Sequence, residues 1–589
     1  MTPPGVSPAP IDERPAAPRG RDPAPAEIAA FLLIAALGLA LRLVYVFHYA
    51  FNSDEPQHLH VAWAWTQGLV QYRDIFDNHT PLFHMLSAPV VAFLRESPDV
   101  LYAMRLAMIP LFLTGLWATY ALGRIVFSPR VGLWAALLAG LEPVFFFESL
   151  EYRTDVLWMA LWFLMLVVLL GGAWTRRRSL AAGLVLGLAL CVSLKSVLLV
   201  AALAGAALGM PFVLARGAGA REVLAEALAS LAPRAIGSRL ALFVAGAVAP
   251  PFALTLLFAS LGALRPFVYG TVLHNCLPGL GGWSRSWRAL DFALIWVLTV
   301  MGVRALVRRL RPDARREGLA FLALLASLYC AALYLLWPIF TRQDMLPWYP
   351  LILILFTGGV DRAWRALAGP RGGVPGRAVA RGSAWVLAPM ALFEIGLLVH
   401  GESLHHDRTG PQRQLIAEVL RLTDAGDYVL DLKGETVFRR RPMYYVFETI
   451  TKLRMNGGWL PERIQEEVLA HGACVAVAEI DRWPLRTQRF LEQNYLVVGR
   501  VRVAGRFLTP SDPARPRDRL EFDVTIPARY AIVAEQGVVA GLLDGAPYDG
   551  PRLLPAGRHA FTVASGAGRL ALVWAQAIER GFSPFTTND

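Results

Sequence analysis

Residues 28–58 read IAAFLLIAALGLALRLVYVFHYAFNSDEPQH, and they contain the pattern that decides the fold. An apolar run extends from Ile28 to Ala50, and a polar, acidic segment follows it directly. A helix of this length crosses the hydrocarbon core of a bilayer, which is roughly 30 Å thick. The run is too long for the core of a signal peptide, and no small-residue cleavage site is evident. We therefore predict a retained membrane helix.

The rest of the chain repeats this apolar pattern. Hydrophobic residues make up 55% of the 589 residues, charged residues only 17%, and the mean hydropathy is +0.44. Soluble domains usually carry about 25% charged residues, so the composition excludes a disordered chain, a collagen-like chain and a simple soluble enzyme. We predict an α-helical polytopic membrane protein with about eleven transmembrane helices. Beyond the first, they lie near 101–122, 131–149, 155–172, 179–195, 197–215, 239–260, 289–307, 318–340, 346–367 and 384–400. Because Lys195 interrupts the pair 179–195 and 197–215, these residues form either two spans, one long helix or a re-entrant pair.

The charge distribution predicts the orientation. The net charge is +12, and only three of the 57 basic residues are lysines: Lys195, Lys433 and Lys452. Arginines gather in the tail and in alternate loops, at 176–178, 216–221, 308–316 and 362–381. Cytoplasmic loops carry such an excess, so we expect a multi-pass protein of the cytoplasmic (inner) membrane with its N-terminus inside and its C-terminal part outside. The basic excess is then topological, and no aromatic–basic pattern indicates nucleic-acid binding. This arginine-rich composition is typical of a bacterium with a GC-rich genome.

The composition divides the chain into four parts. Residues 1–27 are predicted to be a disordered cytoplasmic tail, and 28–401 a membrane region with external loops at 51–100 and 261–288. The first loop holds two segments, 55–69 and 80–95, that suit interfacial helices. Residues 402–508 alternate strand and helix patterns and predict a small α/β domain. Residues 509–589 show short strands with Gly/Pro turns and predict a β-sandwich-like domain. These two parts either bind the acceptor or its glycan, or only pack on the membrane region.

The acidic segment behind the first span carries the densest group of polar side chains. Asp54 and Glu55 are adjacent carboxylates at the expected outer membrane boundary, and His58 follows them. Paired carboxylates split each other's pKa values, which suits acid–base catalysis. The structural alternative is that Ser53 or Asp54 caps an interfacial helix.

Further polar motifs lie on the same predicted side of the membrane. Each one alone is also explained by a polar turn, local ion pairing, snorkelling or a capped helix start. Together they are expected to surround an anionic lipid head group that enters from the outer leaflet. The motifs are Tyr72–Leu82 with Asp77 and His79, Glu148–Asp155 with Arg153 and Asp155, the turn at Lys195, and Thr341–Pro350 with Arg342.

Two other features concern the surroundings of this site. Arg42 lies within the first span, so it must snorkel or pair with an acid, and we expect it to help position the first loop. The loop 261–288 contains His274, Asn275 and several glycines, and it is either a lid over the site or an ordinary flexible loop. The four cysteines lie far apart, which indicates no disulfide framework and no zinc ribbon.

The order of these motifs resembles that of the GT-C membrane glycosyltransferases. The chain has an acidic pair after the first span, a Tyr-Arg-Asp-x-x-Asp-x-x-x-Pro-Leu stretch, an Arg-x-Asp before the fourth span, and an Arg-x-x-x-Leu-Pro-x-x-Pro stretch. It is most similar in pattern to the protein O-mannosyltransferase and aminoarabinose (lipid A) transferase families, over roughly residues 28–360. The resemblance implies a polyprenyl-phosphate-sugar donor, a lipid, glycan or protein acceptor outside the membrane, and inversion at the anomeric carbon.

The resemblance also implies roles for individual residues. It implies that Asp54, as the base that deprotonates or orients the acceptor, acts with Glu55 and Asp155 in catalysis. It implies that Arg153, Lys195 and Arg342 face the donor phosphate. His79 stands where many relatives have a lysine, so it either binds the phosphate in its protonated form or ligates a metal. Supporting roles fall to Asp77, His58 and Arg42.

No cofactor is certain from the sequence, and other functions remain open. No cluster has strong metal-ligand spacing, so the involvement of a divalent metal is undecided, and no P-loop or Rossmann fingerprint occurs in the membrane region. One alternative is a transporter or flippase for a lipid-linked sugar, although we find no repeated halves and the acids gather in an external loop. Another is a non-catalytic, glycan-binding membrane scaffold, for which Asp54→Asn would leave function intact.

Overall fold

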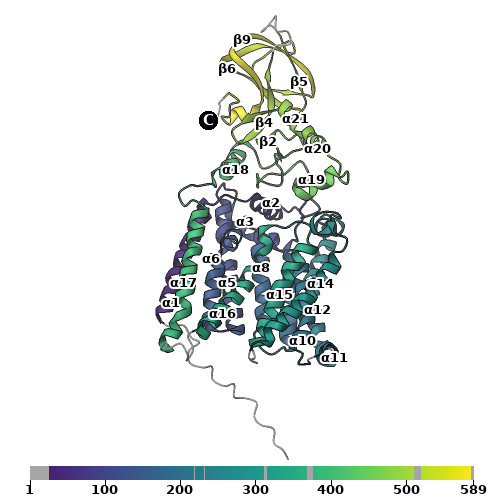
Figure 1. Ribbon diagram of the computed structural model, residues 1–589. Helices are drawn as coiled ribbons and strands as arrows, with labels where there is room; N and C mark the ends of the chain where they lie inside the picture. The colour runs from purple at the N-terminus through teal and green to yellow at the C-terminus, as the bar shows by residue number, and fades with distance from the viewer. Residues whose placement is uncertain are drawn as a thin grey trace, which may run out of the picture.

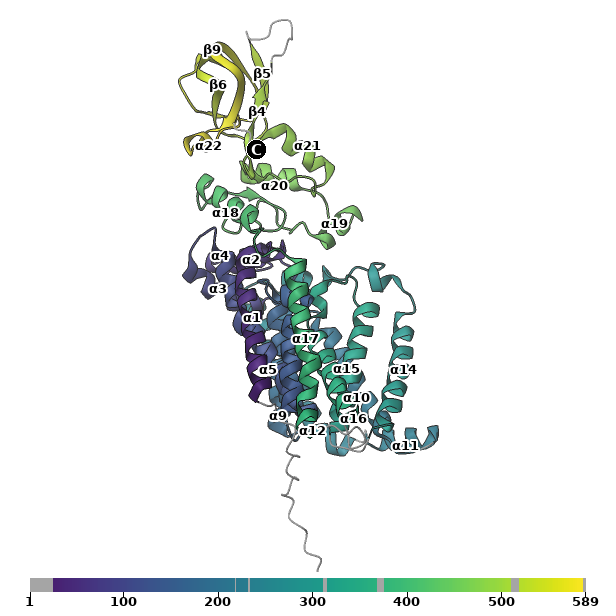
Figure 2. The same ribbon diagram turned by 60° about the vertical axis from the view of Figure 1, so that its left-hand side comes forward.

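The computed structural model of the chain describes residues 25–217, 219–230, 233–310, 315–367, 376–509 and 519–585. A helical bundle carries a second part, the C-terminal region (residues 402–585), on one of its ends (Figures 1 and 2). Of the predicted tail, residues 1–24 lie outside the described residues, and Pro25–Glu27 already belong to the first helix. This helix begins at the end of the bundle far from the C-terminal region (Figure 1).

A helix lies at each of the eleven predicted positions. Helices α9 and α10 are separate, so Lys195 stands in a turn between two helices and not within one long helix. Within the described residues, seven helices are long and apolar enough to cross a membrane, and the full count of eleven crossings stays a prediction. The bounds are α1 (Pro25–His48), α5 (Ile109–Val126) preceded by α4 (Val100–Ala107), α6 (Pro129–Leu141) followed by α7 (Pro143–Glu148), α8 (Thr154–Leu170), α9 (Arg176–Val192), α10 (Ser196–Leu214), α12 (Pro233–Ser260), α14 (Arg288–Arg308), α15 (Arg315–Leu336), α16 (Tyr349–Leu367) and α17 (Gly376–Gly401).

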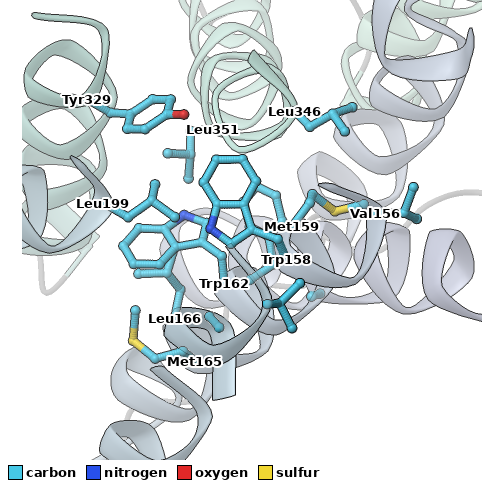
Figure 3. Close-up of a cluster of buried hydrophobic side chains, with 14 of the residues drawn as sticks. Val156, Trp158, Met159, Trp162, Met165, Leu166, Leu199, Tyr329, Leu346 and Leu351 are labelled. Atoms are coloured by element: carbon cyan, nitrogen blue, oxygen red, sulfur yellow. The ribbon is translucent and has the colours of Figure 1, made fainter. Parts of the chain in front are cut away.

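The core of the bundle is built around α8. Trp158 and Trp162 of this helix pack together with Tyr329 of α15 and Leu199 of α10 (Figure 3). Two polar groups of this cluster are hydrogen-bonded, as buried polar groups usually are. Trp158 Nε1 donates to Ser196 Oγ at 2.9 Å, and the Tyr329 hydroxyl donates to the carbonyl oxygen of residue 344 at 2.5 Å. The cluster therefore fixes the start of α8, the turn before α10 and the segment around residue 344 relative to one another.

The two predicted interfacial segments are both helices, but they are placed differently. Helix α3 (Leu82–Leu94) leaves Leu86 and Phe93 exposed, as an interfacial helix would. Helix α2 (Asp54–Thr66) is buried from Glu55 to Ala64 and lies between the bundle and the C-terminal region (Figure 1). The prediction of a surface position was wrong for α2, because the C-terminal region covers the side that would face the interface.

The loop 261–288 is folded and tied to its neighbours. It contains α13 (Leu264–Val268), the π-helical turn η1 (Tyr269–Leu273) and the 3₁₀ turn η2 (Gly281–Ser284). Asn275 Nδ2 donates to the carbonyl oxygen of Asn78 at 2.8 Å, and Arg454 Nε donates to the carbonyl oxygen of His274 at 2.9 Å. Opening and closing of this loop as a lid stays a prediction.

The C-terminal region contains one continuous run of paired strands. Strand β4 pairs with β2 and β3 along one part of its length and with β9 along another, across the predicted boundary at 508/509. One apolar core serves both predicted domains, so their separation stays a prediction. The strands are β1 (Val429–Leu430), β2 (Val475–Val477), β3 (Tyr495–Val498), β4 (Val501–Leu508), β5 (Leu520–Val524), β6 (Ala528–Leu543), β7 (Ala546–Pro547), β8 (Arg552–Leu554) and β9 (Gly557–Trp574).

The last strands and the helices differ in detail from the sequence patterns. Strand β6 is one long strand that continues through Gly537, and its register with β9 shifts at irregularities around this glycine, which has a positive φ. Among the helices of the part 402–508 are α20 (Ile464–His471) and α21 (Leu485–Asn494). The remaining helices are α18 (Gly410–Leu422), α19 (Thr449–Asn456) and α22 (Ala575–Glu579).

Candidate active site

A polar cavity of about 350 Å³ lies between the bundle and the C-terminal region. Four of the predicted site residues line it: Asp54, His79, Arg153 and Lys195. They come from the start of α2, the loop before α3, the residue before α8 and the turn before α10. The described part of the C-terminal region adds Lys433, Glu448 and Arg482 to the lining.

Asp54 is held between two cations. Its Oδ2 atom lies 2.7 Å from Arg153 Nη2, and its Oδ1 atom pairs with Lys433 Nζ. Burial alone would raise the pKa of Asp54, but Arg153 and Lys433 together hold it well below its usual range. The side chain is 26% exposed, so an ionised carboxylate faces the cavity.

A chain of alternating charges continues from Arg153 toward α15. Arg153 Nε lies 3.4 Å from Asp155 Oδ2, Asp155 Oδ1 accepts from Lys195 Nζ at 3.0 Å, and Lys195 Nζ lies 2.5 Å from Asp344 Oδ1. Asp155 stands in the first turn of α8, where the helix dipole favours an acid. Asp344 is fixed by a capping box, since its Oδ2 accepts from the backbone and side chain of Thr341 at 2.8 Å each. The capped helix start expected as an alternative is thus real, and it orients one member of this chain.

Glu55 does not reach the cavity. It is fully buried, and its carboxylate accepts from Arg105 Nε at 2.8 Å, from Arg105 Nη2 at 2.6 Å and from the Tyr152 backbone at 2.9 Å. Neighbouring residues of a helix point in different directions, so Asp54 and Glu55 cannot share one site. Glu55 instead joins α2 to α4 and to the segment before α8.

His79 has a carboxylate behind it. Its Nδ1 atom lies 3.0 Å from Asp77 Oδ1, and Gln71 Nε2 donates to Asp77 Oδ2 at 2.7 Å. Burial lowers the pKa of His79, but the Coulombic effect of Asp77 is opposite and the net result is a raised pKa. Burial lowers the pKa of His58, which lies behind His79 and contacts His84 at 2.9 Å between Nδ1 and Nε2. This arrangement favours a protonated His79 over a neutral one.

Metal ligation receives no geometric support from the described residues. Among them, no group of three or more His, Cys, Asp or Glu side chains is placed to hold a metal ion.

Two predicted basic residues lie outside the cavity. Arg342 is exposed and does not line it, so its contact with a donor phosphate stays a prediction. Arg42 neither snorkels nor pairs with an acid among the described residues, which corrects the expectation. It donates to the carbonyl oxygens of Phe146 at 3.0 Å and Ser149 at 2.5 Å and stacks on Phe112, because the end of α7 presents free carbonyl groups.

Four residues at the site were missed by the sequence analysis. Asp344 stood within the quoted Thr341–Pro350 motif, and its spacing from Thr341 matches a capping box, so this signal was available. For Lys433, one feature of the sequence could have indicated a special role, namely the rarity of lysine in the chain. No sequence feature indicated Glu448 or Arg482, because only the docking of the C-terminal region brings them to the cavity. Arg482 forms no ion pair within the described residues.

Comparisons with known proteins bear on the fold of the chain. The model of the dolichyl-phosphate-mannose-protein mannosyltransferase family matches residues 78–236. No curated protein sequence matches the chain. The crystal structures of ArnT from Cupriavidus metallidurans, bound to undecaprenyl phosphate and in the apo state, are similar to this chain with a TM-score of 0.53 and 14% identity. They cover 82% and 81% of this chain and 98% of ArnT.

A second solved structure is more distant. The Archaeoglobus fulgidus oligosaccharyltransferase tethered with an acceptor peptide has a TM-score of 0.42 and 12% identity, over 82% of this chain and 73% of that protein. The likeness to ArnT shows that the chain has the GT-C fold that the motif order indicated, with a bundle of apolar helices and a C-terminal sheet region.

Proposed function

We propose that this chain, which has the fold of the GT-C membrane glycosyltransferases, transfers a sugar from a polyprenyl-phosphate donor to an extracytoplasmic acceptor with inversion. The observation that carries the proposal is an ionised carboxylate, Asp54, that faces a cavity with Arg153 and Lys195 in its wall. The similar ArnT structure is bound to undecaprenyl phosphate, which supports a donor of this class. The match to the mannosyltransferase family over residues 78–236 supports the same reaction type.

The proposed reaction is a single displacement at the anomeric carbon. The acceptor nucleophile forms a bond to this carbon while the bond from the carbon to the phosphate oxygen breaks, so the configuration inverts. Asp54 accepts a hydrogen bond from the acceptor and takes its proton as the new bond forms. With a depressed pKa, Asp54 is a weak base in the ground state, so it contributes mainly by orienting the nucleophile and by accepting the proton late.

The leaving group is a lipid phosphate, and its charge is stabilised by cations in the cavity wall. Arg153 and Lys195 are already shared with carboxylates, so they offer only part of their charge to a donor. His79, when protonated, adds a further positive charge to the cavity wall. We assign the phosphate to the space between His79, Arg153 and Lys195.

The proposed location of the reaction follows from the position of the cavity. It lies at the end of the bundle that carries the C-terminal region (Figure 1). Helix α11 (Ala220–Ser230), next to one of the arginine-rich loops, lies at the opposite end (Figure 2). Basic loops face the cytoplasm, so we place the cavity on the outer side of the inner membrane.

The test uses purified protein in liposomes with a panel of labelled polyprenyl-phosphate hexoses and pentoses and a membrane extract as the source of acceptors. We expect release of free polyprenyl phosphate with one class of donor, and a loss of about a hundredfold or more in Asp54→Asn, as for removal of a general base. Equal release by wild type and variant would contradict the role of Asp54. No release with any donor would contradict the proposed function and favour a transporter or a scaffold.

A further inference from the structure

The second cation on Asp54 comes from a distant part of the chain. Lys433 belongs to the C-terminal region, 379 positions away from Asp54, and its side chain is only 6% exposed. Of the three lysines in the sequence, Lys195 and Lys433 both line the cavity, whereas Lys452 is exposed on α19. In a chain that otherwise uses arginine, two of three lysines therefore lie at one site.

The turn that carries Lys433 is rigidly built. The carboxylate of Asp431 accepts from the backbone of Gly434 at 2.8 Å and of Thr436 at 3.0 Å. Arg441 Nε donates to the same carboxylate at 2.6 Å, and Asp431 is fully buried. Charge-assisted hydrogen bonds of this kind fix the backbone of residues 431–437, which we call the Lys433 turn.

The Lys433 turn is also locked onto α2. His60 Nδ1 lies 2.7 Å from the carbonyl oxygen of Val437. Gly434 has φ +105°, and a Cβ added there would lie 2.7 Å from the Cβ atom of His60, so only glycine fits against α2. Because α2 begins at Asp54, the contact that positions the Lys433 turn also sets where Lys433 stands relative to Asp54.

The balance of charges around the cavity explains why a lysine lies next to Asp54. On the bundle side of the cavity, four carboxylates (Asp54, Glu151, Asp155 and Asp344) contact two cations (Arg153 and Lys195). Burial raises the pKa of Glu151 to about 8, so the other three carboxylates are the ones that carry charge at neutral pH. A carboxylate without a partner in such a partly buried place is costly and tends to become protonated. Lys433 supplies the missing positive charge to Asp54, the carboxylate that faces the cavity.

We propose that Lys433 is a positioning residue for Asp54, so that the C-terminal region completes the catalytic site and does not merely pack on the bundle. The inference rests on the proposed function and deepens it. Lys433 holds the Asp54 carboxylate in one orientation and in its ionised form, which is the state that accepts a hydrogen bond from the acceptor.

The pH dependence of the reaction follows from the groups around Asp54. The charged and titratable side chains that face it are Arg153, Lys433, His58 and His79. Removal of Lys433 takes away one cation that lowers the pKa of Asp54, so this pKa rises. The reaction needs ionised Asp54, so the rate falls when acidification protonates this carboxylate. Without Lys433 this fall occurs at a higher pH than in wild type, which shifts the acid limb of the pH–rate profile to higher pH.

The experiment compares Lys433→Gln, Lys433→Arg and Lys452→Gln with wild type in the liposome assay. We expect Lys433→Gln to lower kcat by about tenfold or more, the size of effect of one lost charge-assisted contact, and to shift the acid limb to higher pH. Lys433→Arg should restore most of the rate and the wild-type pH profile, and Lys452→Gln should match wild type. A Lys433→Gln variant with wild-type kcat and an unchanged profile would overturn the proposal.

A second measurement is independent of turnover and of the folding of Lys433→Gln. An amine-reactive reagent followed by mass spectrometry reports the labelling rates of Lys433 and Lys452 in wild type and in Asp54→Asn. We expect Lys433 to react faster in Asp54→Asn, while Lys452 reacts equally in both. If wild type transfers no sugar, the proposed function fails, and an unchanged Lys433 rate in this measurement separately overturns the pairing with Asp54.

Discussion

At the scale of single residues, the adjacent acids Asp54 and Glu55 lie in different surroundings. Asp54 faces the cavity, whereas Glu55 forms a buried ion pair with Arg105. A helix turns about 100° between successive residues, so two neighbouring acids reach different surroundings. Their variants should therefore fail in different ways.

We predict that Glu55→Gln destabilises the fold more than Asp54→Asn does. Removing one partner of a buried ion pair costs about 3–5 kcal/mol, since the other charge stays buried. Glu55 and Arg105 are both fully buried, whereas the side chain of Asp54 is 26% exposed, so Asp54→Asn breaks ion pairs that are less buried. Thermal unfolding in detergent should therefore show a lower Tm for Glu55→Gln than for Asp54→Asn. A Glu55→Gln protein with wild-type Tm but no turnover would place Glu55 in the chemistry.

We predict that His79 makes donor binding dependent on pH. Asp77 raises the pKa of His79, so the positive charge is fully present below the ordinary histidine pKa and is lost as pH rises through the raised value. We expect affinity for undecaprenyl phosphate to fall by about tenfold across this range, as one charge-assisted contact weakens.

Calorimetric titration with undecaprenyl phosphate at several pH values tests the role of His79 in wild type, His79→Lys and His79→Gln. His79→Lys should keep the affinity at alkaline pH, and His79→Gln should bind weakly at every pH. Identical pH dependence in all three proteins would show that another group controls binding.

At the scale of elements, the loop 261–288 depends on one arginine of α19. The guanidinium of Arg454 donates to three backbone groups of this loop, the carbonyl oxygens of Leu273 (2.6 Å), His274 (2.9 Å) and Cys276 (2.9 Å). Loop carbonyl groups without such a donor would turn to water.

We predict that Arg454→Gln loosens this loop. Hydrogen exchange should become faster in residues 261–288, because three backbone acceptors lose their partner. Arg486→Gln is the matched control, since Arg486 forms an exposed ion pair with Glu466 on the surface of the same region. Exchange in the loop that stays at the wild-type rate in Arg454→Gln would mean that Asn275 and its neighbours hold the loop without Arg454.

At the scale of the whole molecule, the two ends of the bundle are chemically different. The C-terminal region and the polar cavity lie at one end, and α1 begins at the other (Figure 2). The arginine-rich loops indicate that this second end faces the cytoplasm.

We predict that the C-terminal region is reached only from outside the cell. In a chain without its four native cysteines, Val538→Cys should react with a membrane-impermeant maleimide in intact cells, because Val538 is 85% exposed. Arg177→Cys, at the exposed start of α9, should react only after the membrane is opened. Labelling of both positions only in opened cells would reverse the proposed orientation.

The amino-acid sequence alone was enough to predict the class of protein and the positions of its helices. Hydrophobicity over about 20 residues is a local property that needs no partner, so helices lie at every predicted position, and Lys195 separates two of them. Two of the predicted spans are each divided into two helices, α4 with α5 and α6 with α7. The ordered motifs also led to four residues that line the cavity: Asp54, His79, Arg153 and Lys195.

Which of these side chains meet depends on tertiary packing, which the sequence patterns did not predict. Glu55 turns away because Arg105 offers it a buried partner, and Arg42 binds carbonyl groups because α7 ends beside it. Lys433 reaches Asp54 because the Lys433 turn fits against α2, a contact between residues 379 positions apart. Local patterns do not encode such contacts, since they depend on how separately formed parts pack together.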